Sequence, residues 1–143
     1  MRAKKRFNGS ADELESAFYD AISRADLDGF MALWAEDEEI VCIHPGEARL
    51  VGHVAIRASW QAIFEGGSVH IRPRQLHATH NMLSAVHSVI EEIQRGADKA
   101  PEIHVLATNV YVKTPRGWRI TTHHASVAAG DAPPDLSKAD VLH

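Results

Sequence analysis

The spacing of apolar residues changes along the chain, and this change limits the possible folds more than any other feature. Over residues 10–67 most apolar residues recur at helical spacing, around one short apolar segment at 40–43. Residues 69–128 are rich in Val, Ile, Thr and aromatic residues and are divided by turn-prone sequence, which is typical of long β-strands. Helices followed by strands predict an α+β domain, with the helices on one face of an antiparallel sheet.

Capping residues set the expected ends of the helices. Ser10 and Glu13 form a capping box, in which each side chain satisfies a free backbone amide of the other residue, so a helix is expected to begin here. Asp26 can cap a second, short helix that we expect to reach about residue 35. A third helix is expected before the glycine pair 66–67, because glycine suits the left-handed conformation that ends many helices.

Segments between turns are expected to form the strands. Ile40–Ile43 is apolar on both alternating faces, which suits a strand covered on two sides, and a turn follows at 44–46. Four longer strands are expected at Val69–Thr79, Met82–Arg95, Ile103–Lys113 and Trp118–Ala128. We therefore expect one domain over residues 10–128, between a basic N-terminal tail at 1–9 and a C-terminal tail at 129–143.

Charge and cysteine content exclude several classes of function. The net charge is −4 over 143 residues, but four basic residues in the N-terminal tail leave −8 on the rest of the chain. Such an acidic domain lacks the basic surface that binds nucleic acid. The single cysteine, Cys42, permits no intramolecular disulfide and no thiolate zinc cluster. No apolar run approaches the roughly 20 residues that span a bilayer, so we expect a soluble cytoplasmic protein that binds neither nucleic acid nor membranes.

Several of these segments, taken in order, resemble one known superfamily. They are Ala25–Trp34, the acidic run and apolar strand after it, the Pro-Gly turn, Leu50–Gly52, Ala55–Trp60 and the final strand Gly117–Ser126. Their order is similar to that of the nuclear transport factor 2-like (NTF2-like) superfamily, and more narrowly to its SnoaL-like and ketosteroid-isomerase-like bacterial branch. The resemblance implies a cone-shaped, cystatin-like α+β fold, in which three N-terminal helices pack in a curved antiparallel β-sheet beside an apolar cavity. It also implies a homodimer formed through the outer face of the sheet.

The resemblance also indicates which positions carry chemistry. Ketosteroid isomerases use a tyrosine on the first helix, an aspartate base before the proline that follows the first strand, and an aspartic acid on the penultimate strand. The matching positions here hold Phe18, His44 and Asn109, unless the alignment shifts by one residue to Tyr19. Because this set lacks the family's phenolic and carboxylic groups, the resemblance argues against steroid isomerisation by that route.

The register of the last hairpin decides which side chains face the cavity. Counting back from a turn at 114–117 pairs Asn109 with Thr122. If Asn109 faces inward, as the resemblance implies, Thr122 and His124 face inward with it, and His123 faces outward.

Our leading hypothesis is a cofactor-free enzyme that moves a proton on an apolar or polyketide-like small molecule, as an isomerase, cyclase or dehydratase does. His44 and His124 would be the acid and the base, because imidazole titrates near neutral pH, and Asn109 would donate a hydrogen bond to oxyanion charge. The side chains expected to bind the ligand are Phe18, Tyr19, Trp34, Trp60, Phe64, Tyr111 and Thr122.

Each of these assignments has a structural alternative. His44 can be a turn histidine bonded to local backbone, Asn109 a satisfied buried amide, and the aromatic residues part of the core. The protein would then be a noncatalytic carrier of a hydrophobic ligand or a homo-oligomeric association domain. We expect no metal and no cofactor, since His77 and His80 face opposite sides of a strand and no recognised ligand spacing or phosphate loop is present.

Overall fold

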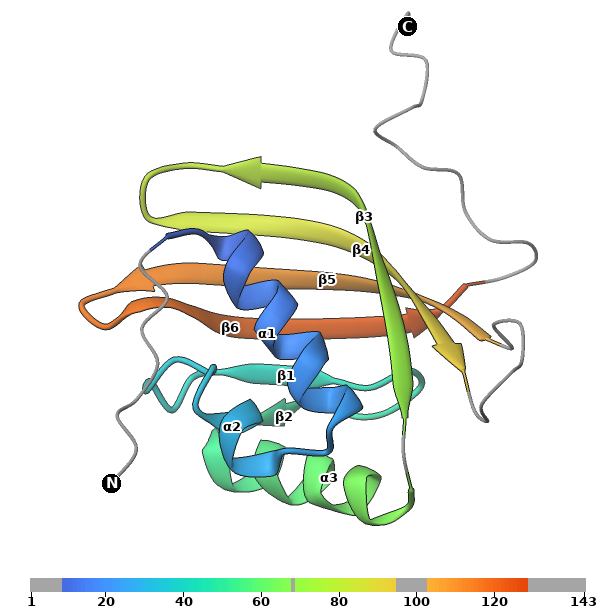
Figure 1. Ribbon diagram of the computed structural model, residues 1–143. Helices are drawn as coiled ribbons and strands as arrows, with labels where there is room; N and C mark the ends of the chain where they lie inside the picture. The colour runs from blue at the N-terminus through green and yellow to red at the C-terminus, as the bar shows by residue number, and fades with distance from the viewer. Residues whose placement is uncertain (1–8, 68, 95–102, 129–143) are drawn as a thin grey trace, which may run out of the picture.

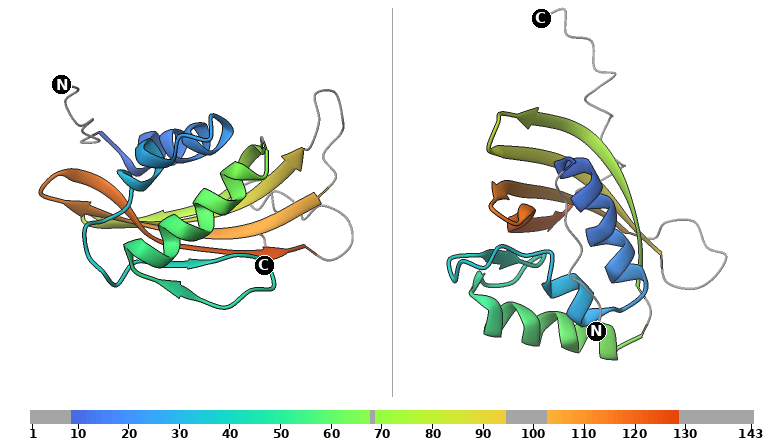
Figure 2. Two further views of the ribbon diagram at one scale, coloured as in Figure 1. Left: turned by 90° about the horizontal axis from the view of Figure 1, so that it is seen from below. Right: turned by 60° about the vertical axis from the view of Figure 1, so that its left-hand side comes forward.

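The computed structural model describes residues 9–67, 69–94 and 103–128, and both predicted tails, apart from Gly9, lie outside this part of the chain. Its helices are α1 (Ala11–Ser23), α2 (Leu27–Met31) and α3 (His53–Glu65). Its strands are β1 (Val41–Ile43), β2 (Leu50–Val51), β3 (His70–His80), β4 (Ser84–Gln94), β5 (Ile103–Thr114) and β6 (Gly117–Val127). All three helices lie on one side of the sheet (Figures 1 and 2).

The strands that the structure describes form one sheet in the order β2-β1-β6-β5-β4-β3. The four long strands pair antiparallel, as expected, whereas β1 pairs parallel with β6. The register of β3 shifts between Gln75 and His77, and such a bulge bends a strand. Figure 1 shows β3 bending beside α1, so the sheet curves around this helix. Among the described helices, none is long and apolar enough to cross a membrane.

The two N-terminal helices begin at the predicted caps. The side chain of Ser10 accepts a hydrogen bond from the backbone N–H of Glu13 at 3.1 Å. The side chain of Asp26 accepts one from the N–H of Gly29 at 3.0 Å. Each bond satisfies one of the amides that a helix leaves free at its N-terminus.

Helix α2 is shorter than expected because the chain after it pairs with β6. The helix ends at Met31, and Trp34 forms a parallel bridge with Ile120. The N–H of Ala35 donates to the carbonyl of Ile120 at 2.8 Å, and the N–H of Ile120 donates to the carbonyl of Leu33 at 2.9 Å. A turn at residues 32–33 ends the helix, and these bonds hold the chain that follows beside β6. The apolar residues predicted to continue the helix, at 33–35, are therefore buried in the core.

An aromatic cluster around Phe30 fills the space between the helices and the sheet. The ring of Phe30 lies 4.7 Å from Trp60 and 4.8 Å from Phe18, centroid to centroid. It also contacts Phe64 at 5.9 Å and Trp34 at 6.2 Å. These five residues form the aromatic cluster. Because Phe30 is fully buried, its ring joins α1, α2 and α3 into one core.

The hairpin of β5 and β6 contains one extra residue in β6. Tyr111 pairs with Ile120, and the preceding residue Val110 pairs with Thr122. Thr121 therefore has no partner on β5. A bulge of this kind moves every later side chain of the strand to the opposite face.

The bulge corrects the register that we counted from the sequence. Asn109 pairs with His123, not with Thr122. His123 is buried and His124 is exposed. The expectation that His124 and Thr122 face inward is therefore wrong, and so is the expectation that His123 faces outward.

Replacement of Ser10 by alanine is expected to lower the free energy of unfolding by about 1 kcal/mol, because the N–H of Glu13 loses its acceptor. Urea unfolding measures the change. Ser16→Ala is the matched control, since Ser16 is exposed within α1 and alanine favours a helix interior. Equal losses in the two variants would show that the cap contributes nothing.

Candidate functional site

A group of polar side chains lies buried between α1 and the concave face of the sheet. Each member is at most 8 % exposed. We call this group the polar cluster; its members are Glu15, Tyr19, His87, Glu91, Asn109, Tyr111 and His123. Two carboxyl groups, two phenols, two imidazoles and one amide are costly to remove from water unless they are paired, and such groups gather at functional sites more often than in ordinary cores.

The cluster is built on one row of paired residues across the sheet. His87 on β4 pairs with Asn109 on β5, and Asn109 pairs with His123 on β6. Paired residues in adjacent strands share a face, so all three side chains point to the helix side. Glu15 and Tyr19 reach them from α1, where a spacing of four residues places both on the buried face.

Glu15 is the acceptor at one end of the cluster. Its Oε2 accepts hydrogen bonds from the hydroxyl of Tyr111 at 2.5 Å and from Nδ1 of His87 at 2.9 Å. A longer contact joins it to Nδ2 of Asn109 at 3.4 Å. Three donors around one oxygen replace the water that burial removes.

Asn109 sets the hydrogen position on His123. Its Nδ2 faces Glu15 and donates to the hydroxyl oxygen of Tyr19 at 2.9 Å, so its Oδ1 must face the other way. That oxygen lies 2.6 Å from Nδ1 of His123 and can only accept. Nδ1 of His123 therefore carries the hydrogen, and Nε2 keeps its lone pair, 3.8 Å from Oε2 of Glu91.

Glu91 is the member of the cluster whose pKa the site shifts close to neutral pH. Burial raises its pKa to about 7, although the hydrogen bond from the Tyr19 hydroxyl at 2.6 Å works in the opposite direction. The nearby Glu15 raises this pKa further. Glu91 can therefore both hold and release a proton near neutral pH.

The neighbours of Glu91 keep fixed protonation states at that pH. Burial, followed by the charge of Glu91, raises the pKa of Tyr19 well above 10, so its hydroxyl remains a donor. Burial lowers the pKa of His123 to about 3, so its imidazole is neutral. Glu91 is then the member of this trio that titrates near neutral pH.

His44, a predicted acid or base, lies beside the polar cluster. Its Nε2 lies 2.7 Å from Oγ of Ser59, and its ring contacts Trp60 at 5.1 Å. Trp60 also contacts His123 at 6.2 Å, so one indole separates the two imidazoles. Burial lowers the pKa of His44, as it does that of His123. The turn histidine and the last strand thus do approach each other, but through His123 and not through His124.

The other predicted site residues divide into three groups. Asn109, Tyr19 and Tyr111 belong to the polar cluster, and Phe18 contacts His123 at 5.4 Å. The predicted ligand contacts Phe18, Trp34, Trp60 and Phe64 belong to the aromatic cluster. Thr122 and His124 alternate with His123 and so lie on the opposite face of the sheet.

Sequence reasoning missed four members of the cluster. The helical spacing of the apolar residues placed Glu15 on the outer side of the first helix, whereas it is buried. Glu91 and His87 were not among the predicted site residues, and His123 was assigned to the wrong face. A signal was present for two of them, because His87 and Glu91 occupy the same alternating face of a strand whose other inward residues, Ala85 and Val89, are apolar.

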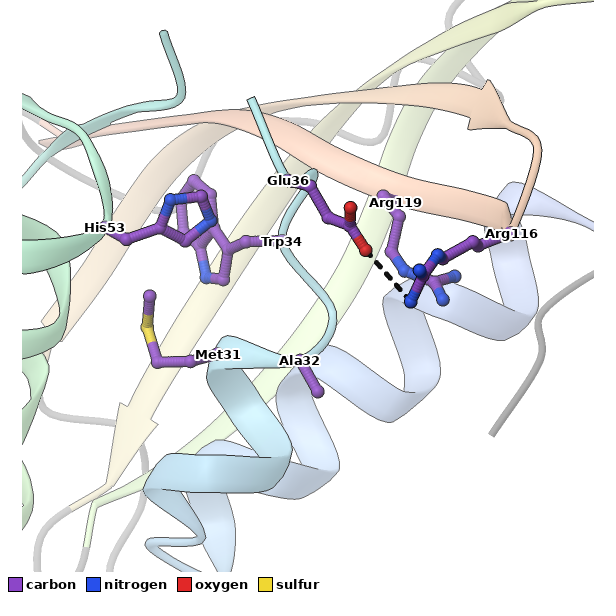
Figure 3. Close-up of a pocket in the computed structure, with 7 residues that line it drawn as sticks. All are labelled: Met31, Ala32, Trp34, Glu36, His53, Arg116 and Arg119. Carbon is purple, nitrogen blue, oxygen red and sulfur yellow. Dashed lines mark ion pairs between the residues drawn. The ribbon is translucent and has the colours of Figure 1, made fainter. Parts of the chain in front are cut away.

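A separate pocket of about 190 Å³ lies near the end of α2 and the start of β6 (Figure 3). Glu36 and Arg116 form an ion pair of 3.1 Å at one end of it, and Trp34 and His53 lie at the other. Its lining residues are Met31, Ala32, Trp34, Glu36, His53, Arg116 and Arg119. It shares no residue with the polar cluster.

The contribution of Glu91 to stability is expected to fall as the pH rises from 4.5 to 7. The unfolded carboxyl of Glu91 loses its proton near pH 4.5, whereas the folded one keeps it until about pH 7. In this window the folded state binds more protons, so raising the pH favours unfolding, by about 3 kcal/mol in total. His123 acts in the opposite direction below pH 6.5, because only its unfolded form takes up a proton there.

The contribution of Glu91 is isolated by comparing wild type with Glu91→Gln in urea unfolding at each pH. The advantage of wild type over the variant should shrink as the pH rises, because glutamine stays neutral. Glu92→Gln, on the neighbouring residue outside the cluster, should leave that pH dependence in place. Parallel curves for wild type and Glu91→Gln would contradict the assignment.

Comparison with known proteins agrees with this architecture. A structure from Thiobacillus denitrificans, named for the association domain of calcium/calmodulin-dependent protein kinase type II, is 34 % identical, with a TM-score of 0.81; the match covers 87 % of this chain and 99 % of that one. A structure from Streptomyces avermitilis, named as a dehydratase of the NTF2-like family, is 26 % identical, with a TM-score of 0.75 and coverage of 83 % and 94 %.

More distant structures share the fold. A ketosteroid isomerase-like protein from Erwinia carotovora atroseptica is 16 % identical, with a TM-score of 0.67 and coverage of 83 % and 94 %. No match was found among curated proteins. The predicted cystatin-like α+β fold is confirmed, with a sheet that does not close into a barrel. The SnoaL-like domain family matches residues 12–130, and the chain therefore belongs to this family within the NTF2-like superfamily.

Proposed function

We propose that the protein is a cofactor-independent enzyme that transfers a proton on a small, mostly apolar molecule, as an isomerase, dehydratase or cyclase does. The observation that supports this most is the meeting of three groups in one buried place. These are the carboxyl of Glu91 with a pKa of about 7, the Tyr19 hydroxyl that donates to it at 2.6 Å, and the neutral imidazole of His123 at 3.8 Å.

Glu91 is the proposed acid–base group. A base works best when its pKa lies close to the working pH, and burial brings Glu91 there. Its carboxylate takes a proton from a carbon next to a carbonyl, and the electron pair of the broken C–H bond moves onto the carbonyl oxygen. The protonated carboxyl then returns the proton to a second carbon in an isomerisation, or to a departing hydroxyl in a dehydration.

Tyr19 is the proposed donor to the oxygen on which charge develops. Its raised pKa keeps the hydroxyl protonated, so it can donate to a substrate oxygen in place of Glu91. Asn109 donates to the same hydroxyl oxygen at 2.9 Å. Donation to the phenol oxygen polarises its O–H bond and makes Tyr19 a stronger donor.

His123 takes the place that the sequence hypothesis gave to His124. Its bond to Asn109 leaves Nε2 as an acceptor that faces Glu91. A proton on Glu91 is thereby held inside the site after it leaves the substrate carbon. Asn109, which we had predicted to be catalytic, acts in this proposal as a positioning residue for Tyr19 and His123.

The family is consistent with such chemistry. The NTF2-like superfamily includes isomerases and dehydratases, and the Streptomyces avermitilis structure is named as a dehydratase. Members of a shared fold carry many functions, so the site residues and not the fold carry the proposal.

Proton abstraction can be measured without knowing the product. We expect the protein to catalyse incorporation of deuterium from D₂O into members of a panel of apolar ketones and β-hydroxy carbonyl compounds, followed by NMR. The rate should rise with pH around a midpoint of about 7, where Glu91 loses its proton. Glu91→Gln should reduce the rate by roughly 10²- to 10⁴-fold, and Tyr19→Phe by roughly 10²- to 10³-fold.

His124→Gln is the matched control, because His124 is the exposed neighbour of His123 and should retain the wild-type rate. Exchange no faster than in buffer across the panel would contradict the proposal. So would a Glu91→Gln variant, shown to be folded by circular dichroism, that exchanges as fast as wild type.

A second candidate function is a homo-oligomeric association domain. The structure that is 34 % identical to this chain is named for an association domain. Trp34, Trp60 and Phe64 pack around Phe30, as expected if the interior serves stability and not a ligand. The outer face of the sheet exposes apolar side chains, among them Leu106.

If the protein is a homodimer formed through the outer face of the sheet, a charged residue introduced on that face should separate the subunits. We expect Leu106→Lys to shift the mass in solution, measured by light scattering, from two chains toward one, because a buried unpaired charge is unfavourable in an interface. Val54→Lys is the control, since Val54 is exposed on α3, away from the sheet. A monomeric wild-type protein would contradict this candidate, and so would a Leu106→Lys variant of unchanged mass.

A further inference from the structure

We propose that Asp12, His80 and His87 form a binding site for one divalent transition-metal ion of the Zn²⁺ type. They come from the first turn of α1, the end of β3 and the middle of β4. Their candidate ligand atoms all lie within 4.8 Å of one another. Two imidazoles and a carboxylate are a common ligand set for such ions, and three protein ligands leave a further position open.

The strongest sign of a ligand is the unused nitrogen of His87. This residue is fully buried, and its Nε2 finds no hydrogen-bond partner among the described residues. Its other nitrogen, Nδ1, lies 2.9 Å from Oε2 of Glu15 and 3.2 Å from the side-chain nitrogen of Gln75, and donation along the shorter contact, to the carboxylate, places the hydrogen on Nδ1. With the hydrogen on Nδ1, Nε2 carries a lone pair directed away from the polar cluster.

That lone pair faces another electron donor. Oδ1 of Asp12 lies 3.8 Å from Nε2 of His87. A lone pair and a carboxylate oxygen repel each other at this distance, and each is a normal metal ligand. A cation bound by both atoms turns the repulsion into attraction.

His80 supplies the third ligand from the solvent side. Its ring lies 5.5 Å from the ring of His87, at an interplanar angle of 72°. His80 and Asp12 are exposed, so their side chains are free to rotate toward an ion held by the buried His87. One fixed ligand and two adjustable ligands can thus close around an ion that enters from solvent.

Neighbouring residues orient the ligands in the manner of known metal sites. Glu15 accepts from Nδ1 of His87 at 2.9 Å, which is the carboxylate–histidine–metal arrangement. The side-chain amide of Gln75 donates to Oδ1 of Asp12 at 3.2 Å. Two of the three proposed ligands, His87 and Asp12, thus have a hydrogen-bond partner outside the ligand set.

The sequence could not reveal this site, because our expectation of no metal rested on ligand spacing along the chain, and the one fold-assembled alternative that we weighed combined His44, His124 and a carboxylate. The bend of β3 and the β3–β4 pairing bring His80 beside His87, and α1 adds Asp12 from 68 positions before His80. The proposal does not rest on the acid–base function, because it uses neither Glu91 nor Tyr19.

The test is calorimetric titration of the chelator-treated full chain with Zn²⁺. We expect one ion bound per chain, with Co²⁺ giving the visible absorption of a low-coordinate site. His80→Ala and Asp12→Asn each remove one exposed ligand and should weaken binding at least about tenfold. The control is His77→Ala, an exposed histidine on the same strand outside the group, which should bind as tightly as wild type.

Two outcomes would overturn the proposal. One is the absence of Zn²⁺ binding up to millimolar concentration. The other is binding that His80→Ala and Asp12→Asn leave unchanged, which would assign the ion to other histidines. Deuterium exchange tests the acid–base site and metal titration tests the proposed metal site, so the failure of one proposal can be recognised independently of the other.

Discussion

The one-residue bulge at Thr121 determines what the interior of this protein contains. Without it, the regular pairing of β5 and β6 would direct Thr122 and His124 to the helices and His123 to the outside. With it, His123 meets Asn109, and the row of paired residues that ends at His87 becomes continuous. The hydrogen bonds that orient Tyr19, fix the hydrogen on His123 and leave its free nitrogen toward Glu91 all depend on this shift of register.

The sequence predicted the parts of the fold that follow from local patterns. The caps at Ser10 and Asp26 and the four long strands are found close to their expected positions. The prediction from sequence failed where contacts between distant segments decide the structure, because residues 33–35 end the helical pattern and bond to β6. It also missed β2, which is too short to give a periodic pattern. The same holds for the site. Asn109 and Tyr19 were identified through the resemblance, but no feature of the hairpin sequence predicts the bulge that turns His123 inward.

The polar cluster lowers the stability of the fold but fixes the positions of its side chains. Seven buried polar residues at the helix–sheet contact occupy space that apolar side chains could fill at lower cost. Hydrogen bonding limits the cost, because Glu15 and Asn109 between them bond to every other member except Glu91, which accepts from Tyr19. The network has two ends. At one end Glu91, Tyr19 and His123 face each other in the interior, and at the other Nε2 of His87 faces Asp12 in the first turn of α1.

The parallel contact between β1 and β6 has a consequence for how the chain reaches this structure. These strands are the only parallel pair within the described sheet, and Cys42 on β1 pairs with His123, about eighty positions later. Contacts so distant in sequence form late, because a long loop must close before they become favourable. During synthesis the helices are therefore made before β6 is available to pair with β1, and the apolar surface that β6 covers stays open to aggregation until then.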